Sequence, residues 1–263
     1  MAADLLQALE LPAQVISLHR SQERRAAFAQ RNGETGLDYV FVDGVDGVQQ
    51  WDAISKSRRV SKGWQSGWSK GAIGSGLSHC LMWRRCLDLN RTICVLEDDV
   101  LVASDWRQRC SEALDQAPKE IDVLLLGWNL DSVLRAEVFS GVACISLFEP
   151  AFPSPQQIKT VLDQQSRRRV VRLEKALGLP GYVLTPRGAQ KLLLGLPRFE
   201  AEPLLVGRGI PQVLSMTLDA QMNRLYPELR AFVVVPPLVL AENDQETSMT
   251  APRQRSLEFG VGE

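Results

Sequence analysis

The stretch TICVLEDDV, residues 92–100, joins a continuous apolar run to three consecutive carboxylates. An uninterrupted apolar run is typical of strands that a parallel sheet buries on both faces. Because side chains alternate along a strand, Glu97 and Asp99 are expected on one side of its end and Asp98 on the other. Adjacent carboxylates repel one another unless a cation lies among them, so the triplet indicates either a divalent-metal site or a solvated acidic turn.

Strand and helix patterns alternate on both sides of this stretch. The predicted strands are AQVIS (13–17), LDYVFVDG (37–44), IDVLLLG (121–127), SGVACISLFEP (140–150), the run before Thr185 and RAFVVVPPLVL (230–240). The predicted helices cover about residues 22–31 after Ser21, 71–87, the segment after Ser104, 156–177, 186–195 after the N-cap Thr185, and 212–225. This order predicts an α/β fold with a mostly parallel central sheet and helices on both faces.

One domain over residues 1–240 accounts for the pattern, with a nucleotide-binding half at about 13–128 and an acceptor-side half at about 129–240. Residues 48–70 have no clear period and predict a long surface loop. Residues 241–263 are polar and predict a loose tail.

Composition narrows the class of protein. The chain has 263 residues, 45% of them apolar, and a formal net charge of −1, so nothing global favours a nucleic-acid partner. Five cysteines without a CxxC spacing predict buried thiols rather than disulfides or a zinc site. No run reaches the roughly 18 apolar residues of a spanning helix, which favours a cytoplasmic protein. Arginines 167–169 and 172 leave peripheral contact with the inner face of a membrane as an option.

The position of the triplet favours a divalent-metal site over a solvated turn. Open α/β sheets bind ligands beyond the carboxyl ends of their strands, where residues 18–20 and 43–47 are also expected. Mg²⁺ and Mn²⁺ accept about six oxygen ligands and commonly take only one or two from the protein, since phosphates and water supply the rest. Such an ion would offset the charge that develops on a diphosphate leaving group.

Several ordered segments resemble glycosyltransferase family 25, the group that includes bacterial lipooligosaccharide galactosyltransferases and the collagen galactosyltransferases. They are VISLHRSQERR (15–25), VDGVDG (42–47), the block from Gly71 to Val102, LPGYVLTPRGAQKLL (179–193) and TLDAQM (217–222). The resemblance implies a GT-A-like, Rossmann-like fold and transfer of a sugar, usually galactose, from a UDP-sugar donor. It also implies Mn²⁺ or Mg²⁺ dependence, inversion at the anomeric carbon, and a glycan or lipopolysaccharide-type acceptor.

The resemblance also suggests roles for individual residues. Those expected around the donor are Arg20, Arg24, Asp46, Ser78, His79, Glu97, Asp98 and Asp99. Glu97 and Asp99 are the expected metal ligands, and Asp219 is the expected catalytic base or a residue that hydrogen-bonds to the ligands of the metal. Each assignment has a structural alternative, because arginines at a helix start often face water, Asp-Gly favours turns, and an aspartate can cap a helix.

Two other functions fit part of the pattern. A sugar nucleotidyltransferase also needs an α/β sheet and a metal, but the first strand is followed by SLHRSQERR, which lacks the glycine-rich phosphate loop usual in those enzymes. A non-catalytic binding domain of the same fold is the second alternative.

Overall fold

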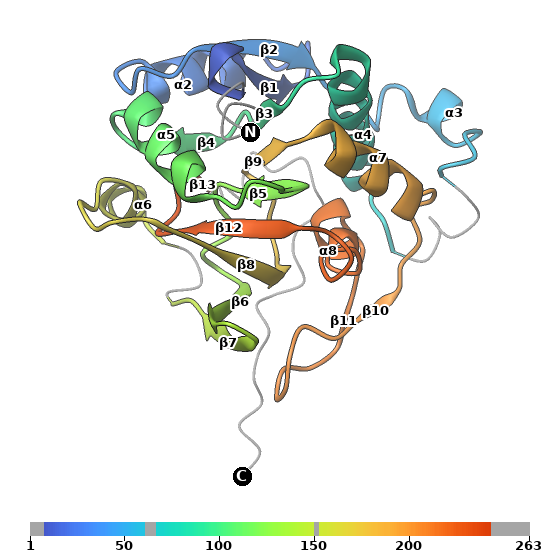
Figure 1. The fold of residues 1–263 in the computed structure, drawn as a ribbon. Helices are drawn as coiled ribbons and strands as arrows, with labels where there is room; N and C mark the ends of the chain where they lie inside the picture. Colours follow the sequence, from blue (N-terminus) through green and yellow to red (C-terminus); the bar gives the residue numbers. More distant parts are fainter. Residues whose placement is uncertain (1–7, 61–66, 150–152, 243–263) are drawn as a thin grey trace.

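A nine-stranded sheet forms the centre of the molecule in the computed structural model, which describes residues 8–60, 67–149 and 153–242 (Figure 1). Its strand order is β2-β1-β3-β9-β5-β12-β8-β6-β7. These strands are β1 (Ala13–Ser17), β2 (Tyr39–Asp43), β3 (Ile93–Glu97), β5 (Val123–Leu125), β6 (Val133–Phe139), β7 (Val142–Leu147), β8 (Arg169–Ala176), β9 (Gly181–Leu184) and β12 (Ala231–Val235).

Helices cover both faces of this sheet. In Figure 1 the helices α4 (Lys70–Leu89) and α7 (Pro186–Gly195) lie on one side, and α2 (Gln22–Asn32), α5 (Trp106–Gln116) and α6 (Pro155–Leu162) lie on the other. Two further short helices are α3 (Trp51–Ile54) and α8 (Leu218–Met222), and residues 8–10 before β1 are also helical. Two small two-stranded sheets pair β10 (Pro203–Leu204) with β11 (Val213–Leu214) and β4 (Val100–Val102) with β13 (Val239–Ala241).

Strand direction confirms the predicted α/β, Rossmann-like architecture. β1 pairs in parallel with both β2 and β3, and β5 pairs in parallel with β12. β9, β8 and β7 run against their neighbours, so the other six strands of the sheet point the same way. Consequently β1, β2 and β3 all end at one edge, and strands from both predicted halves of the chain share a single sheet.

Alternation along the central strands divides the core between the two faces. In β3, Ile93 and Val95 belong to the core that includes Trp83 of α4. Cys94 and Leu96 of the same strand belong to the core that includes Phe28 of α2. Burial on both faces explains why this strand is apolar throughout, as the sequence indicated.

Some local predictions are wrong. The region 156–177, expected to be helical, contains the short helix α6 and then the strand β8, which hydrogen-bonds to β12 and β6. The helix expected over 212–225 is limited to α8 because residues 213–214 pair as β11. Helix α5 is preceded by Asp105 and not by Ser104, Cys144 is exposed, and the expected loop 48–70 contains α3. Residues 61–66 of that loop and 243–263 of the predicted tail lie outside the described residues.

Candidate functional site

The carboxyl ends of three neighbouring parallel strands bring polar side chains together. β1 ends at Ser17, β2 at Asp43 and β3 at Glu97, and residues 98–99 form the turn that leads from β3 into β4. We call Glu97, Asp98 and Asp99 the acidic triplet. The parallel alignment that the sequence predicted therefore places the triplet where open sheets bind ligands.

Asp98 is a buried carboxylate held by its neighbours. Its Oδ2 accepts a hydrogen bond of 2.7 Å from the Ser17 hydroxyl, and its Oδ1 accepts one of 2.9 Å from Nε of Arg24 and a further contact from the same guanidinium. Only 6% of Asp98 is exposed. Asp98 therefore anchors helix α2 to the end of β3, and Arg31 adds a hydrogen bond of 2.9 Å to its backbone carbonyl.

Asp99 is placed differently from its neighbour. Its Oδ2 lies 3.5 Å from Nη2 of Arg24, whereas its Oδ1 is buried and has no hydrogen-bond partner among the described residues. Burial and then repulsion from Glu97 raise the pKa of Asp99 to about 7. Loss of water at an unpaired oxygen is costly unless a cation or a donor replaces it. Asp99 is thus the member of the triplet best suited to bind something from outside the chain.

Arg24 carries the charge that balances the triplet. Burial would lower the pKa of its guanidinium, but the hydrogen bond to Asp98 and the charges of Asp99, Asp98 and Glu97 raise it above the usual value. The arginine predicted from the helix start therefore lies within the acidic cluster and not on an open helix face.

Glu97 faces the opposite helix layer. Its Oε1 lies 3.3 Å from Nε2 of His79, and Nδ1 of His79 lies 3.1 Å from the hydroxyl of Tyr182. Trp83 donates a hydrogen bond of 3.1 Å to the same hydroxyl. His79 is 2% exposed, so it contacts Glu97 from inside the protein. The resemblance placed His79 around the donor but did not reveal these partners.

The loop after β2 packs closely on the start of α4. Ser78 is buried, and its Oγ accepts a hydrogen bond of 2.8 Å from the backbone of Val45. A Cβ added to Gly47 would lie 1.8 Å from the carbonyl oxygen of Lys70, and one added to Gly74 would lie 2.6 Å from the backbone nitrogen of Gly47. Glycine is therefore required at positions 47 and 74 for this approach.

Asp46, in the same loop, is engaged by its surroundings. Its Oδ2 accepts a hydrogen bond of 2.5 Å from Arg20, and its Oδ1 accepts bonds of 3.0 Å from the backbones of Val48 and Gln49. Burial would raise the pKa of Asp46, but these hydrogen bonds outweigh it and lower the pKa. The carboxylate closes the turn, which was the structural alternative to a donor contact. Arg20 remains 44% exposed and can face a ligand.

A second arginine of α2 stabilises the neighbouring strand end. Arg25 donates a hydrogen bond of 2.5 Å to Asp43 and one of 3.2 Å to the backbone carbonyl of Ser17. His19 lies 3.4 Å from the same Asp43 carboxylate and is largely exposed. Sequence reasoning missed Ser17, although its place at the last position of the first strand is the signal that could have found it.

Asp219 lies on α8, a short helix that packs against α4. Its Oδ2 accepts a hydrogen bond of 2.6 Å from the backbone of Gly178. Two residues further on, Pro180 accepts a hydrogen bond of 3.0 Å from the backbone of Glu97. The segment 178–180 thus connects Asp219 to the triplet's edge of the sheet, and the half-buried aspartate has no direct contact with the triplet among the described residues.

The triplet fits a divalent ion only if a ligand completes the coordination. Within residues 8–60, 67–149 and 153–242, no group of three or more His, Cys, Asp or Glu side chains is arranged to hold a metal. Asp98 is occupied by Arg24 and Ser17, whereas Oδ1 of Asp99 is unpaired, and the charge of Glu97 acts on the same carboxylate from two residues away. One or two protein ligands are normal for Mg²⁺ or Mn²⁺ when a diphosphate and water provide the others.

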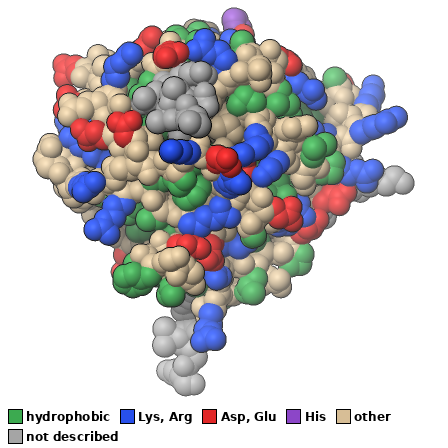
Figure 2. Space-filling model, viewed as in Figure 1, with side chains coloured by type: hydrophobic (Ala, Val, Ile, Leu, Met, Phe, Trp, Pro, Cys, Tyr) green, Lys and Arg blue, Asp and Glu red, His purple; other side chains and the backbone are tan. Residues whose placement is uncertain are grey.

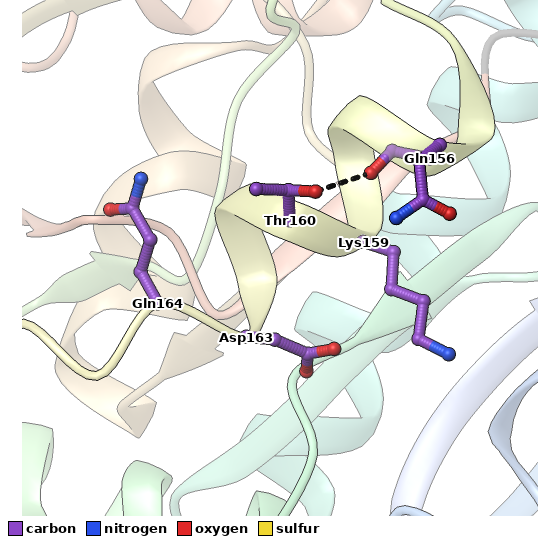
Figure 3. A pocket seen from close by; sticks show the side chains of 5 residues that line it. All are labelled: Gln156, Lys159, Thr160, Asp163 and Gln164. Atoms are coloured by element: carbon purple, nitrogen blue, oxygen red, sulfur yellow. Dashed lines mark hydrogen bonds between the residues drawn. The ribbon is translucent and has the colours of Figure 1, made fainter.

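Other surface features offer less chemistry. On the face shown in Figure 2, basic and acidic side chains are interspersed without an extended basic stripe. A shallow hollow along α6 is lined by side chains of one segment, as Figure 3 shows; they are Gln156, Lys159, Thr160, Asp163 and Gln164. It contains none of the residues at the triplet's edge. No helix in the described part of the chain is long and apolar enough to cross a membrane.

The fold and site define an α/β protein with an acidic, arginine-balanced edge at the carboxyl ends of parallel strands, where open sheets bind ligands. Residues 11–201 match the profile of glycosyltransferase family 25, described as an LPS biosynthesis protein. The chain therefore belongs to glycosyltransferase family 25, as its motifs indicated.

Two relatives agree with this assignment. A "Glycosyltransferase 25 family member" from Anopheles gambiae is 27% identical over 198 residues, which cover 72% of this chain and 30% of that protein. A Haemophilus influenzae protein with a provisional glycosyltransferase name is 25% identical over 181 residues, which cover 68% of this chain and 55% of that protein. The aligned part thus spans about a third and about half of these relatives.

Proposed function

We propose that this protein transfers a sugar from a UDP-sugar to a glycan or lipopolysaccharide-type acceptor, and galactose is the first candidate for that sugar. The proposed reaction inverts the anomeric carbon and depends on Mn²⁺ or Mg²⁺. The observation that carries the proposal is the unpaired, buried Oδ1 of Asp99, on a carboxylate that contacts Arg24 through Oδ2 and is repelled by the charge of Glu97, at the carboxyl ends of parallel strands. Family membership supports the reaction class, and the carboxylates support the metal.

In this proposal Asp99 and Glu97 hold the ion, which would offset the negative charge that develops on the departing diphosphate. Arg24 balances the carboxylates through Asp98, so that the triplet stays compact with or without donor. Arg20 lies at the end of β1 with 44% of its side chain exposed, where it can contact the nucleotide phosphates.

Asp219 is the proposed base for the acceptor hydroxyl. One of its oxygens is fixed by Gly178, which orients the carboxylate on the segment that leads to Glu97. Inversion requires a direct attack of the acceptor oxygen on the anomeric carbon, with its proton passing to the base. A carboxylate separate from the triplet, and connected to its edge of the sheet through residues 178–180, is the proposed acceptor of that proton.

A panel of UDP-sugars tests the proposal. With Mn²⁺ present, we expect slow release of UDP from UDP-galactose or another UDP-sugar, faster release with the correct acceptor, and none with chelator. Asp99→Asn should abolish turnover, whereas Asp115→Asn, which removes an exposed carboxylate of α5, should not. Binding of no donor in a thermal-shift screen, or unchanged turnover in Asp99→Asn, would refute the mechanism.

A further inference from the structure

We propose that Trp83 and Tyr182 fix the tautomer of His79, so that this buried histidine donates a hydrogen bond to Glu97 and orients its carboxylate within the acidic triplet. The three side chains form one connected path, from Trp83 Nε1 to the Tyr182 hydroxyl, from that hydroxyl to His79 Nδ1, and from His79 Nε2 to Glu97 Oε1. They act as positioning residues because none of them reaches the open edge.

The direction of each bond follows from the chemistry of the groups. An indole N–H can only donate, so the Tyr182 oxygen accepts from Trp83. Tyr182 is fully buried, and within the described residues His79 Nδ1 is the other hydrogen-bonding partner of its hydroxyl. Burial keeps the pKa of Tyr182 well above its ordinary value, so the hydroxyl retains its proton. That proton is donated to Nδ1.

A histidine whose Nδ1 accepts a hydrogen bond carries its proton on Nε2 when neutral. Nε2 lies 3.3 Å from Glu97 Oε1, at the long end for such a bond, so the contact guides the carboxylate without binding it tightly. The bond uses Oε1 and does not involve Oε2 of Glu97, whose side chain is 31% exposed.

The other neutral tautomer is unfavourable in this geometry. A proton on Nδ1 would turn the lone pair of Nε2 toward the Glu97 carboxylate. Trp83 and His79 would then both donate to the Tyr182 hydroxyl, whose own proton would be buried without an acceptor among the described residues. Outer partners that fix a ligand's orientation in this way are a common means of tuning a metal site.

Nitrogen-15 NMR tests the tautomer of His79 in protein treated with a chelator and free of donor. The chain contains only two histidines, so their signals can be assigned. His19 is 82% exposed, so His19→Gln identifies the signals of His79. We expect Nδ1 of His79 at the downfield shift of an unprotonated nitrogen and Nε2 at the upfield shift of a protonated one. A protonated Nδ1, in the other tautomer or in an imidazolium, overturns the proposal.

Tyr182→Phe removes the hydroxyl and keeps the ring, and it should move the Nδ1 shift of His79. Tyr226→Phe is the matched control, since Tyr226 is equally buried and its hydroxyl has no hydrogen-bond partner in the described structure. The control should leave the His79 shifts unchanged. Equal effects of the two variants, or no effect of Tyr182→Phe, contradict the proposed chain, and the wild-type shifts decide the matter even if a variant does not fold.

The role of Glu97 as an oriented metal ligand rests on the proposed function. The hydrogen bonds themselves do not, because they exist without donor or metal. With a UDP-sugar, Tyr182→Phe should lower kcat/KM about 10-fold, the lower end of the loss when an outer partner of a metal ligand is removed. The expected shifts without any turnover would refute the function and leave the hydrogen-bond chain in place. Turnover with a protonated Nδ1 would refute the chain alone.

Discussion

Replacing Asp99 with asparagine should stabilise the metal-free protein while it removes the proposed metal site. The wild-type carboxylate is held beside Glu97 with one oxygen buried and unpaired, and its pKa is raised from the ordinary 3.8 to about 7. Ionisation of Asp99 therefore opposes folding at neutral pH. Asparagine has nearly the same shape and carries no charge.

The size of the effect follows from the pKa. A shift of about 3 pH units corresponds to about 4 kcal/mol at 1.36 kcal/mol per unit. Because 34% of the Asp99 side chain is exposed, solvent screening reduces the expected gain to about 1–2 kcal/mol. For a chain of this size, such a gain raises Tm by about 2–8 °C.

The sign depends on pH. A carboxyl group whose pKa is raised in the folded state stabilises the protein while protonated, and that stability is lost as pH rises from about 4 through about 7. The advantage of Asp99→Asn should thus be full at pH 8 and absent below about pH 4. Melting curves in chelator at several pH values measure it, with Asp115→Asn as the control for an exposed carboxylate. A lower Tm for Asp99→Asn at pH 8, or a gain independent of pH, would refute the reasoning.

Three further substitutions have defined outcomes. Arg24→Ala leaves Asp98, which is 6% exposed, without its cation and should lower the free energy of unfolding in urea by about 2–4 kcal/mol. Arg24→Lys should restore only part of this free energy, because lysine cannot make both contacts of the guanidinium. Gly47→Ala places a Cβ 1.8 Å from the Lys70 carbonyl oxygen and should cost about 1–3 kcal/mol or more, with weaker donor binding in calorimetry. Asp219→Asn should lower kcat about 100-fold or more while donor affinity is kept, and an unchanged kcat would exclude it as the base.

Local signals explain what could be predicted from the sequence. The strand before the triplet and the helix capped by Thr185 depend on short-range patterns, and both appear as expected. β8 was mistaken for helix because its alternation is weak, and it becomes a strand through pairing with β12 and β6. The extent of α8 was overestimated because residues 213–214 pair with a segment about ten residues earlier. Strand pairing of this kind depends on tertiary context and cannot be predicted from the local sequence.

In the candidate site, too, the positions of single side chains depend partly on tertiary context that the local sequence does not encode. Strand alternation correctly separates Glu97, which faces His79, from Asp98, which faces Arg24. It fails for Asp99, because the chain turns at residues 98–99 and brings this carboxylate within 3.5 Å of Arg24.

Three adjacent acids therefore become unequal through partners that are remote in sequence. Asp98 is satisfied by α2 and β1, and Glu97 is guided by α4 and β9. Of these three carboxylates, only Asp99 retains a buried oxygen without a partner in the described structure. If the triplet were only an acidic turn, solvent would satisfy that oxygen and the pKa of Asp99 would stay near its ordinary value. The raised pKa and the missing partner together describe a position that is unfavourable until a cation or donor group binds, which is why the stability gain and the functional loss of Asp99→Asn should occur in the same variant.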